Sequence, residues 1–271
     1  MAPVNDTRPR RRHALVAYVG LLGVVGLLAG ACASKTPDFE DVAPADELYA
    51  EGIKTLEGRM ILWVYPLIDY SKAIESFQAI IDNYPYSEYA VKAELRIADA
   101  YFDDGRYEEA LSYYRDFGDL HPQHPEVPYT LLRSALCHYR QIKSVNRDQT
   151  ATREAQQYLE QLIRRYPYAP ETRQGERVLR ELRTRLAWSV MRTGDFYLKR
   201  DEYQSAAERY RSLLNSYPGL GLDAEGLFKL GVCYENMKLE DEALRLFHVV
   251  MENFQGTELA TAAAEHIAAA N

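Results

Sequence analysis

The sequence predicts an all-α protein: a right-handed superhelical solenoid of about five helical hairpins with a C-terminal capping helix. The first observation behind this fold class is residues 89–122, which hold two amphipathic helical patterns around a tight turn at Asp103-Asp104-Gly105. A hairpin of about 34 residues with this layout is typical of a tetratricopeptide repeat. One such hairpin cannot bury its apolar face alone, so neighbours of the same kind are expected.

The second observation is a motif of the second helix that recurs along the chain. It consists of an alanine, a large apolar residue four positions later, and a proline eight positions after that. The complete copies are Ala73-Phe77-Pro85, Ala110-Tyr114-Pro122, Ala155-Leu159-Pro167 and Ala206-Tyr210-Pro218. The first two residues share one helix face, and the proline ends the helix. A fifth copy keeps the pair, as Ala243 and Phe247, without the proline. We interpret these alanine and apolar positions as core.

Residues 1–31 read as a targeting segment and are set apart from the fold. Four arginines between positions 8 and 12 precede an uncharged apolar run over residues 14–31, and Cys32 follows directly. A plain secretory signal, an uncleaved anchor near the lower length limit for a spanning helix, and a lipoprotein signal cleaved before Cys32 are the three interpretations. The cysteine after the small residues Ala29-Gly30-Ala31 favours the lipoprotein signal, although Ala29 stands where the usual motif has leucine.

Lipid on Cys32 would place the mature protein on a membrane, because several acyl chains together give stable anchoring. Ser34 is not the aspartate that retains lipoproteins at the inner membrane. The expected location is therefore the periplasmic face of the outer membrane. Residues 32–45 contain prolines and acidic residues without periodicity and are expected to be a flexible tether.

The charge balance excludes binding to nucleic acid or anionic lipid through bulk attraction. The 271-residue chain has a net charge of −8. Residues 1–31 carry four arginines and one aspartate, so the mature chain keeps 28 basic and 39 acidic residues, a balance of −11. Cys137 and Cys233 fall in helical patterns of different repeats, and we interpret both as small buried apolar residues and not as a disulfide.

The N-terminal repeats are expected over residues 46–168. The first opens near Asp46, and the stretch over residues 60–68 that follows its first helix is too apolar to be a simple turn. The turn of the third repeat is enlarged into a polar loop over residues 142–150, which contains Asn146-Arg147-Asp148. Loops that interrupt a regular array often carry function; a tolerated surface insertion is the alternative.

The C-terminal repeats are expected over residues 169–271. They begin with the longest helical pattern, residues 170–199, which would extend about 45 Å at 1.5 Å per residue and join the two halves of the array. Its arginines, Arg177, Arg180, Arg183, Arg185 and Arg192, either form a solvated face or meet acidic groups of a partner. The fourth repeat closes over residues 203–217, the fifth spans 222–254, and the Ala-rich segment 257–270 is expected to cover the exposed end of the stack.

The sequence carries no motif for catalysis, a cofactor or a metal. A Gly-rich phosphate loop, a nucleophile elbow and a His-Glu-x-x-His pair are all absent. His121 and His124 flank a proline, but no carboxylate or cysteine at ligand spacing accompanies them. We therefore expect a binding protein and not an enzyme.

Tetratricopeptide arrays hold partner segments on the concave surface lined by their first helices. Hairpin geometry places six residues of the early repeats on that surface: Tyr49, Lys92, Asp99, Phe102, Tyr129 and Tyr139. Aromatic rings with a cation and an anion in one groove suit a peptide with apolar side chains and a free end. The alternative for each residue is a packing role between repeats.

The chain resembles the family of the outer-membrane protein assembly factor BamD over nearly all of its mature length. The resemblance rests on the lipobox cysteine, the repeats, Asn146-Arg147-Asp148-Gln149 ahead of the helix with Ala155, and the segments Arg185-Leu186-Ala187 and Phe196-Tyr197-Leu198-Lys199-Arg200. It departs from the family pattern at two positions. Ala29 stands where the lipobox usually has leucine, and Val190 stands where the family often has glutamate.

The resemblance implies an accessory subunit of the complex that folds β-barrel proteins into the outer membrane. It implies that the N-terminal repeats receive unfolded substrate segments and that the C-terminal repeats dock the periplasmic domains of the barrel subunit, beside other accessory lipoproteins. The position matching the family's docking arginine is Arg185, and the matching loop is Asn146 to Asp148. A cell-envelope or cell-division repeat lipoprotein without a barrel partner is the alternative function.

Overall fold

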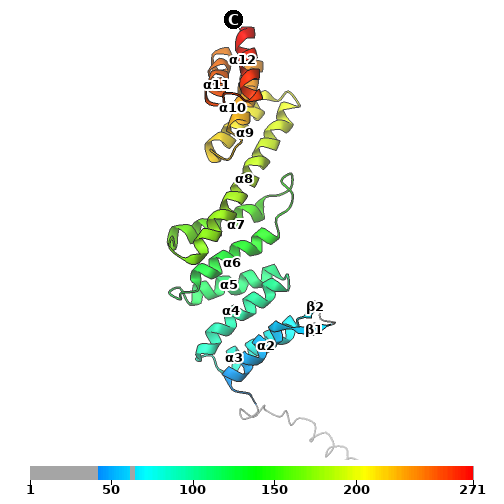
Figure 1. Ribbon diagram of the computed structural model, residues 1–271, viewed down its shortest axis with the longest axis vertical. Helices are drawn as coiled ribbons and strands as arrows, with labels where there is room; N and C mark the ends of the chain where they lie inside the picture. The colour runs from blue at the N-terminus through cyan, green and yellow to red at the C-terminus, as the bar shows by residue number, and fades with distance from the viewer. Residues whose placement is uncertain (1–41, 62–64, 271) are drawn as a thin grey trace, which may run out of the picture. The chain divides into compact units, whose positions relative to one another are not determined.

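Paired helices follow one another along the chain in the computed structural model, which describes residues 42–61 and 65–270 (Figure 1). The predicted signal over residues 1–31, Cys32 and most of the tether lie outside the described residues. The helices, labelled as in Figure 1, are α2 Ala45–Glu57, α3 Tyr70–Asn83, α4 Glu88–Asp103, α5 Tyr107–Leu120, α6 Val127–Arg140, α7 Thr150–Arg165, α8 Pro170–Leu198, α9 Tyr203–Ser216, α10 Asp223–Asn236, α11 Glu240–Asn253 and α12 Glu258–Ala270. None of the helices among the described residues is both long and apolar enough to cross a membrane.

Local chemistry sets the ends of these helices. The side chain of Asp69 accepts a hydrogen bond of 3.0 Å from the backbone N–H of Lys72 at the start of α3. Ser87 does the same for Ala90 at the start of α4, at 3.2 Å. Such caps satisfy backbone donors that the helix cannot. A proline follows two residues after α3, α5, α7 and α9, and because proline cannot continue the helix, each hairpin ends there.

The predicted tetratricopeptide solenoid is confirmed, with the motif residues in its core. The alanine and the large apolar residue of all five copies are at most 2% exposed. Each core cluster draws side chains from successive helices, so that α9, for example, packs against both α8 and α10. Burial of these apolar faces therefore requires the neighbouring hairpins, as expected for repeats that share their core.

Close approach of the two helices in a hairpin depends on a small residue facing a ring. A Cβ atom at Gly231 on α10 would lie 2.7 Å from Phe247 of α11, and one at Gly194 on α8 would lie 2.6 Å from Tyr210 of α9. Both distances are shorter than real contacts of a Cβ. Glycine at these positions therefore lets the ring of the second helix lie directly against the backbone of the first.

Two of the hairpins carry an enlarged connection between their helices. In the first repeat, β1 (Arg59–Ile61) and β2 (Tyr65–Leu67) pair antiparallel, with Arg59 opposite Leu67. The sequence indicated that this stretch was more than a turn, but the all-α prediction did not include the strands. In the third repeat, the residues between α6 and α7 form the predicted polar loop.

Helix α8 belongs to both halves of the array, as predicted. Its 29 residues extend about 43 Å. Leu182 in its first half packs in the cluster built by α6 and α7, whereas Ala187 and Met191 in its second half pack with α9 and α10. One continuous helix therefore fixes the third repeat relative to the fourth.

A polar contact between consecutive repeats occurs twice with the same spacing. Tyr114 donates to Asp99 at 2.6 Å, and Arg133, 34 residues after Asp99, donates to the Tyr114 hydroxyl at 2.9 Å. In the C-terminal half, Tyr210 and Lys229 donate to Asp195 at 2.8 and 2.7 Å, again 15 and 34 residues further on. Because the third partner lies on the first helix of the next repeat, these groups, the interrepeat clamps, couple adjacent hairpins.

The C-terminal end of the stack is covered by α12. The ring of His266 stacks on Phe247 with a centroid distance of 4.6 Å, and its Nδ1 lies 3.0 Å from a carboxylate oxygen of Glu235. Cys137 and Cys233 are free and buried, and burial raises their pKa values to about 12 and about 11. Both therefore serve as small core residues, as predicted.

Replacing Gly231 by alanine should destabilise the protein by about 1–3 kcal/mol, because its methyl group would overlap the ring of Phe247. Chemical denaturation of the variant measures this loss. Gly118→Ala on α5 is the matched control: a Cβ there meets only Thr130, at 3.8 Å. Equal stabilities of the two variants would contradict the packing role of Gly231.

Candidate functional site

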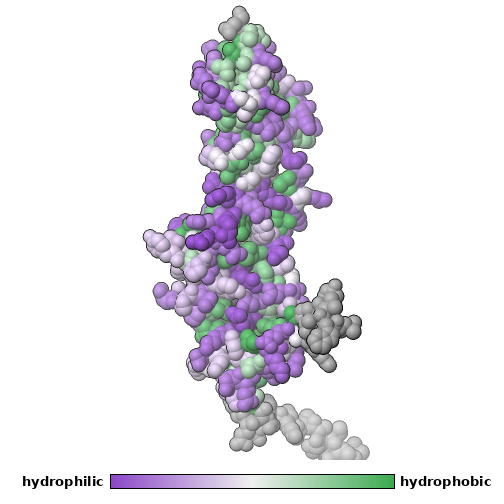
Figure 2. Space-filling model, in the orientation of Figure 1, coloured by the Kyte–Doolittle hydropathy of each residue, from purple (hydrophilic) through white to green (hydrophobic). Residues whose placement is uncertain are grey.

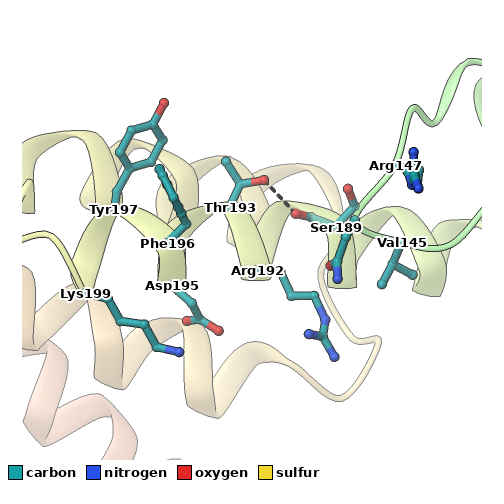
Figure 3. A pocket seen from close by; sticks show the side chains of 10 residues that line it. Val145, Arg147, Ser189, Arg192, Thr193, Asp195, Phe196, Tyr197 and Lys199 are labelled. Atoms are coloured by element: carbon teal, nitrogen blue, oxygen red, sulfur yellow. Dashed lines mark hydrogen bonds between the residues drawn. The ribbon is translucent and has the colours of Figure 1, made fainter.

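An open cleft lies between the loop after α6 and the second half of α8 (Figure 3). Its volume is about 640 Å³. The loop contributes Val145, Asn146 and Arg147. Helix α8 and the residue that directly follows it contribute the other lining residues, which are Ser189, Arg192, Thr193, Asp195, Phe196, Tyr197 and Lys199. The structure therefore brings together the predicted loop and the segment Phe196 to Lys199, which are about 50 positions apart in the sequence.

The loop side of the cleft is held in shape by a buried glutamine. Gln149 is 5% exposed, and its amide donates to the carbonyls of Ser144 and Arg147, both at 2.9 Å. Its side-chain oxygen accepts from the hydroxyl of Thr152 at 2.9 Å. A buried amide with its groups satisfied fixes the backbone around it. Gln149 thus positions the exposed residues Asn146 to Asp148.

Arg185 connects this loop to α8. Its guanidinium donates to the backbone carbonyl of Lys143, and its buried Nε–H has no hydrogen-bond partner within the described residues. Arg185 does not line the cleft but lies about one turn before the first α8 residue of the cleft, Ser189. The predicted docking arginine therefore contacts the polar loop over residues 142–150 at Lys143, and not at Asn146 to Asp148.

The cleft presents positive charge that the protein does not neutralise. Arg147, Arg192 and Lys199 form no ion pair within the described part of the chain. The one acidic lining residue, Asp195, is bound by Lys229 and by the hydroxyl of Tyr210. The cleft therefore carries three available cations in a chain whose net charge is −8.

The contacts of Asp195 belong to the C-terminal interrepeat clamp. Burial lowers the pKa of Lys229, but its hydrogen bonds to Asp195 and Glu225 outweigh this, and the net shift is upward. Burial and the hydrogen bond to Asp195 raise the pKa of Tyr210. Lys229 therefore stays charged, and the carboxylate of Asp195 faces the cleft already paired.

Apolar surface accompanies these cations on α8. In Figure 3, Arg192, Asp195 and Lys199 extend to one side of the helix, and Thr193, Phe196 and Tyr197 extend to the other. Phe196 is 55% exposed, and the guanidinium of Arg200 lies 5.1 Å from the centre of its ring. Trp188, which lies on the same helix, is 39% exposed. Exposed aromatic rings beside arginines are typical of protein interfaces.

The first half of α8 carries further arginines away from the cleft. Arg173, Arg177 and Arg180 are exposed and form no ion pair among the described residues. Their spacing of four and three positions places them on one helix face. Figure 2 shows strongly hydrophilic side chains gathered near α7 and this part of α8.

Three of the six residues predicted for a peptide groove, Asp99, Phe102 and Tyr129, take part in packing between repeats. Asp99 and Phe102 are each 8% exposed. Asp99 accepts from Tyr129 at 2.7 Å, and the guanidinium of Arg133 lies 3.8 Å from the ring centre of Phe102. The structure thus brings three of the six together as packing around the N-terminal interrepeat clamp, which is the alternative that the sequence left open.

The other three predicted groove residues form contacts of their own. Tyr49 contacts Tyr89, with ring centres 5.5 Å apart, and the ammonium of Lys92 lies 5.0 Å from the same ring. Lys92 also pairs with Glu88 at 3.0 Å. Tyr139 lies on α6, where its hydroxyl donates to Glu181 of α8 at 2.6 Å.

Sequence reasoning missed the positioning role of Gln149 and the pairing of Asp195 with Lys229. The pairing of Asp195 with Lys229 had a signal in the sequence, because Asp99 and Arg133 show the same 34-residue spacing. The role of Gln149 had no such signal, since a glutamine beside polar residues also suits a solvated loop.

Comparison with known proteins agrees with this architecture over most of the chain. Residues 43–264 match the model of the YfiO family, described as outer membrane lipoprotein. The outer membrane protein assembly factor BamD of Rickettsia prowazekii is 30% identical over 244 residues, which cover 90% of this chain and 94% of the relative. The BamD proteins of Caulobacter vibrioides and Neisseria gonorrhoeae are 27% and 26% identical, covering 89% and 85% of this chain and 76% and 88% of theirs. The chain therefore belongs to the BamD family of outer membrane protein assembly factors.

Proposed function

We propose that this protein is a lipid-anchored scaffold subunit of the complex that assembles β-barrel proteins in the outer membrane. Membership of the BamD family supports the assembly role. In this proposal the cleft beside α8 docks the periplasmic domains of the barrel subunit. Other accessory lipoproteins would bind elsewhere on the repeats, and unfolded barrel segments are the substrate.

The observation that carries the docking proposal is the unpaired positive charge of the cleft. Arg147 comes from the loop, whereas Arg192 lies on α8 and Lys199 directly follows it, so an acidic partner surface would contact both elements at once. Arginine binds carboxylates through a planar fork that a lysine lacks. The exposed ring of Phe196 adds apolar area that a partner could cover.

The rigid support of the cleft suits docking more than catalysis. The loop is fixed by Gln149 and Arg185, and α8 is fixed by packing in two core clusters. The hydroxyl of Thr193 already donates to the carbonyl of Ser189 at 2.8 Å. No histidine lines the cleft, and its one carboxylate is paired. We therefore assign it a binding role.

Charge reversal at the cleft should weaken the complex with the barrel subunit. Arg192→Glu places an anion where the partner's acidic groups would lie, and the affinity should fall about tenfold or more at low salt. Co-purification from detergent-solubilised membranes and titration of the purified components measure the loss. Arg185→Glu should have a similar effect, because it also releases the loop.

Arg173→Glu provides the matched control for both reversals. It makes the same charge change on an exposed residue of α8, outside the cleft. If Arg192→Glu and Arg185→Glu keep the barrel subunit at high salt, the docking assignment is wrong. Adducts with cell-wall or septal proteins in place of the barrel subunit would favour the cell-envelope role instead.

Membrane attachment should depend on the thiol of Cys32. Mass measurement of the N-terminal peptide from native membranes should show acylated Cys32 as the first residue. When residues 1–31 are replaced by a plain secretory signal that is removed, Cys32→Ser should release the protein from the membrane fraction, because the described helices offer no membrane span. An unmodified thiol in a membrane-bound protein would rule out the lipid anchor.

A further inference from the structure

The first half of α8 carries three arginines that the docking function does not use. Arg173, Arg177 and Arg180 are exposed and have neither an ion pair nor a hydrogen bond within the described residues. They occupy two turns of one side of the helix, so their backbone positions span about 10 Å. None of them lines the cleft beside α8. We call the surface that they form with Tyr168 and Trp188 the arginine face.

An exposed aromatic ring lies beyond each end of the three arginines. Tyr168, two positions before the start of α8, is 98% exposed, and Trp188 is 39% exposed. Trp188 follows Arg177 by eleven positions, or about three turns, and so shares its side of the helix. Neither the phenol hydroxyl nor the indole N–H has a hydrogen-bond partner among the described residues. Both rings can therefore lie where an apolar layer borders a polar one.

The positive charge of the arginine face is local. Residues 170–192 of α8 carry six arginines and three glutamates, a balance of +3, in a chain whose net charge is −8. On the exposed side, Glu181 accepts a hydrogen bond from Tyr139 of α6 at 2.6 Å, whereas Glu176 has no partner within the described part of the chain. Charges more than about 8–10 Å away are largely screened at physiological ionic strength. An anionic surface that approaches the face therefore meets its cations before the acidic remainder of the chain.

The order of these side chains favours a lipid surface over a protein partner. A protein interface gathers its aromatic anchors at the centre and leaves charge to the rim. On the arginine face the charges are central, and the rings lie at the two ends, where Pro170 and Trp188 are about 27 Å apart along the helix. A bilayer offers anionic phosphates across its whole surface, and amphipathic rings settle at the level of the headgroups. The planar fork of arginine matches a phosphate as well as a carboxylate.

We propose that the arginine face rests on the anionic phospholipid headgroups of the membrane that carries the protein. The guanidinium groups bind headgroup phosphates, and Tyr168 and Trp188 lie in the interfacial layer. Such a contact does not hold a protein by itself, because stable attachment takes a second signal. This inference rests on the proposed function for that second signal, the lipid on Cys32. The face then orients the anchored repeats relative to the bilayer.

The test uses the mature chain with Cys32→Ser, made behind a plain secretory signal that is removed, so that no acyl chain contributes. Sedimentation with vesicles of phosphatidylethanolamine and phosphatidylglycerol, mixed about three to one, measures binding to an anionic surface. Binding should fall as salt is added and should be about tenfold weaker on phosphatidylcholine alone. Arg177→Ala combined with Arg180→Ala should lower the partition coefficient about twentyfold, since each basic side chain contributes about fivefold.

The emission of Trp188 reports the contact directly. The other of the two tryptophans is removed as Trp63→Phe, so that Trp188 is the one indole left. Its emission should shift to shorter wavelength when anionic vesicles are added, because the ring leaves water for the interfacial layer. The double arginine variant should show no shift at the same lipid concentration.

Arg106→Ala combined with Arg245→Ala is the matched control, because it removes the same two charges from exposed arginines outside α8. An equal loss in both double variants, equal binding to neutral vesicles, or unchanged Trp188 emission would overturn the proposal. Preference of the face for poly-glutamate over the anionic vesicles would also overturn it and assign the face to an acidic protein.

Docking of the barrel subunit in detergent separates this proposal from the proposed function. The Arg177 and Arg180 variant should dock normally, because both residues lie outside the cleft. Absence of docking by the wild-type chain would contradict the proposed function and leave the vesicle result standing. Normal docking without any binding to anionic vesicles would overturn the arginine face alone.

Discussion

The structure depends on one constraint: no hairpin in the stack can bury its own apolar face. Phe247 and Tyr210 lie against glycines of their own hairpins, but the clusters that contain them are completed by side chains of the next helices. Each repeat is therefore fixed by its neighbours. The interrepeat clamps around Asp99 and Asp195 add a polar contact at the same junctions.

This constraint determines how the surfaces are built. Helix α8 is held by two core clusters, so the backbone positions on its outer face are fixed without further support. The loop after α6 lacks a core of its own and is held by Gln149 and Arg185 instead. The cleft thus joins a rigid helix to a loop that depends on a few hydrogen bonds. Arg185 has a structural role there as well as its charge.

The sequence predicted the hairpins because their signals are local. An alanine and a large apolar residue four positions apart identify the buried face of the helix. The proline eight positions later identifies its end, so the whole signal lies within 13 residues. The roles of Asp99 and Phe102 were not predictable, because helix periodicity does not distinguish an inward face from an interface with the next repeat. The residues that hold Asp99 in the interface between repeats, Tyr114 and Arg133, lie 15 and 34 positions away from it in the sequence. The strands β1 and β2 escaped prediction since a short apolar run suits several structures.

The proposed docking surface joins the two halves of the array, because its lining comes from the loop of the third repeat and from the second half of α8. It offers cations beside an exposed ring, which suits a folded acidic partner.

The most direct test of the central claim is photo-crosslinking in cells from position 196, with a photoreactive amino acid in place of Phe196. Tyr168, which is 98% exposed outside the cleft, provides the control position. The account predicts an adduct with the periplasmic domains of the barrel subunit from position 196 and little or none from 168. Adducts from 168 alone, or none with the barrel subunit from either position, would contradict it.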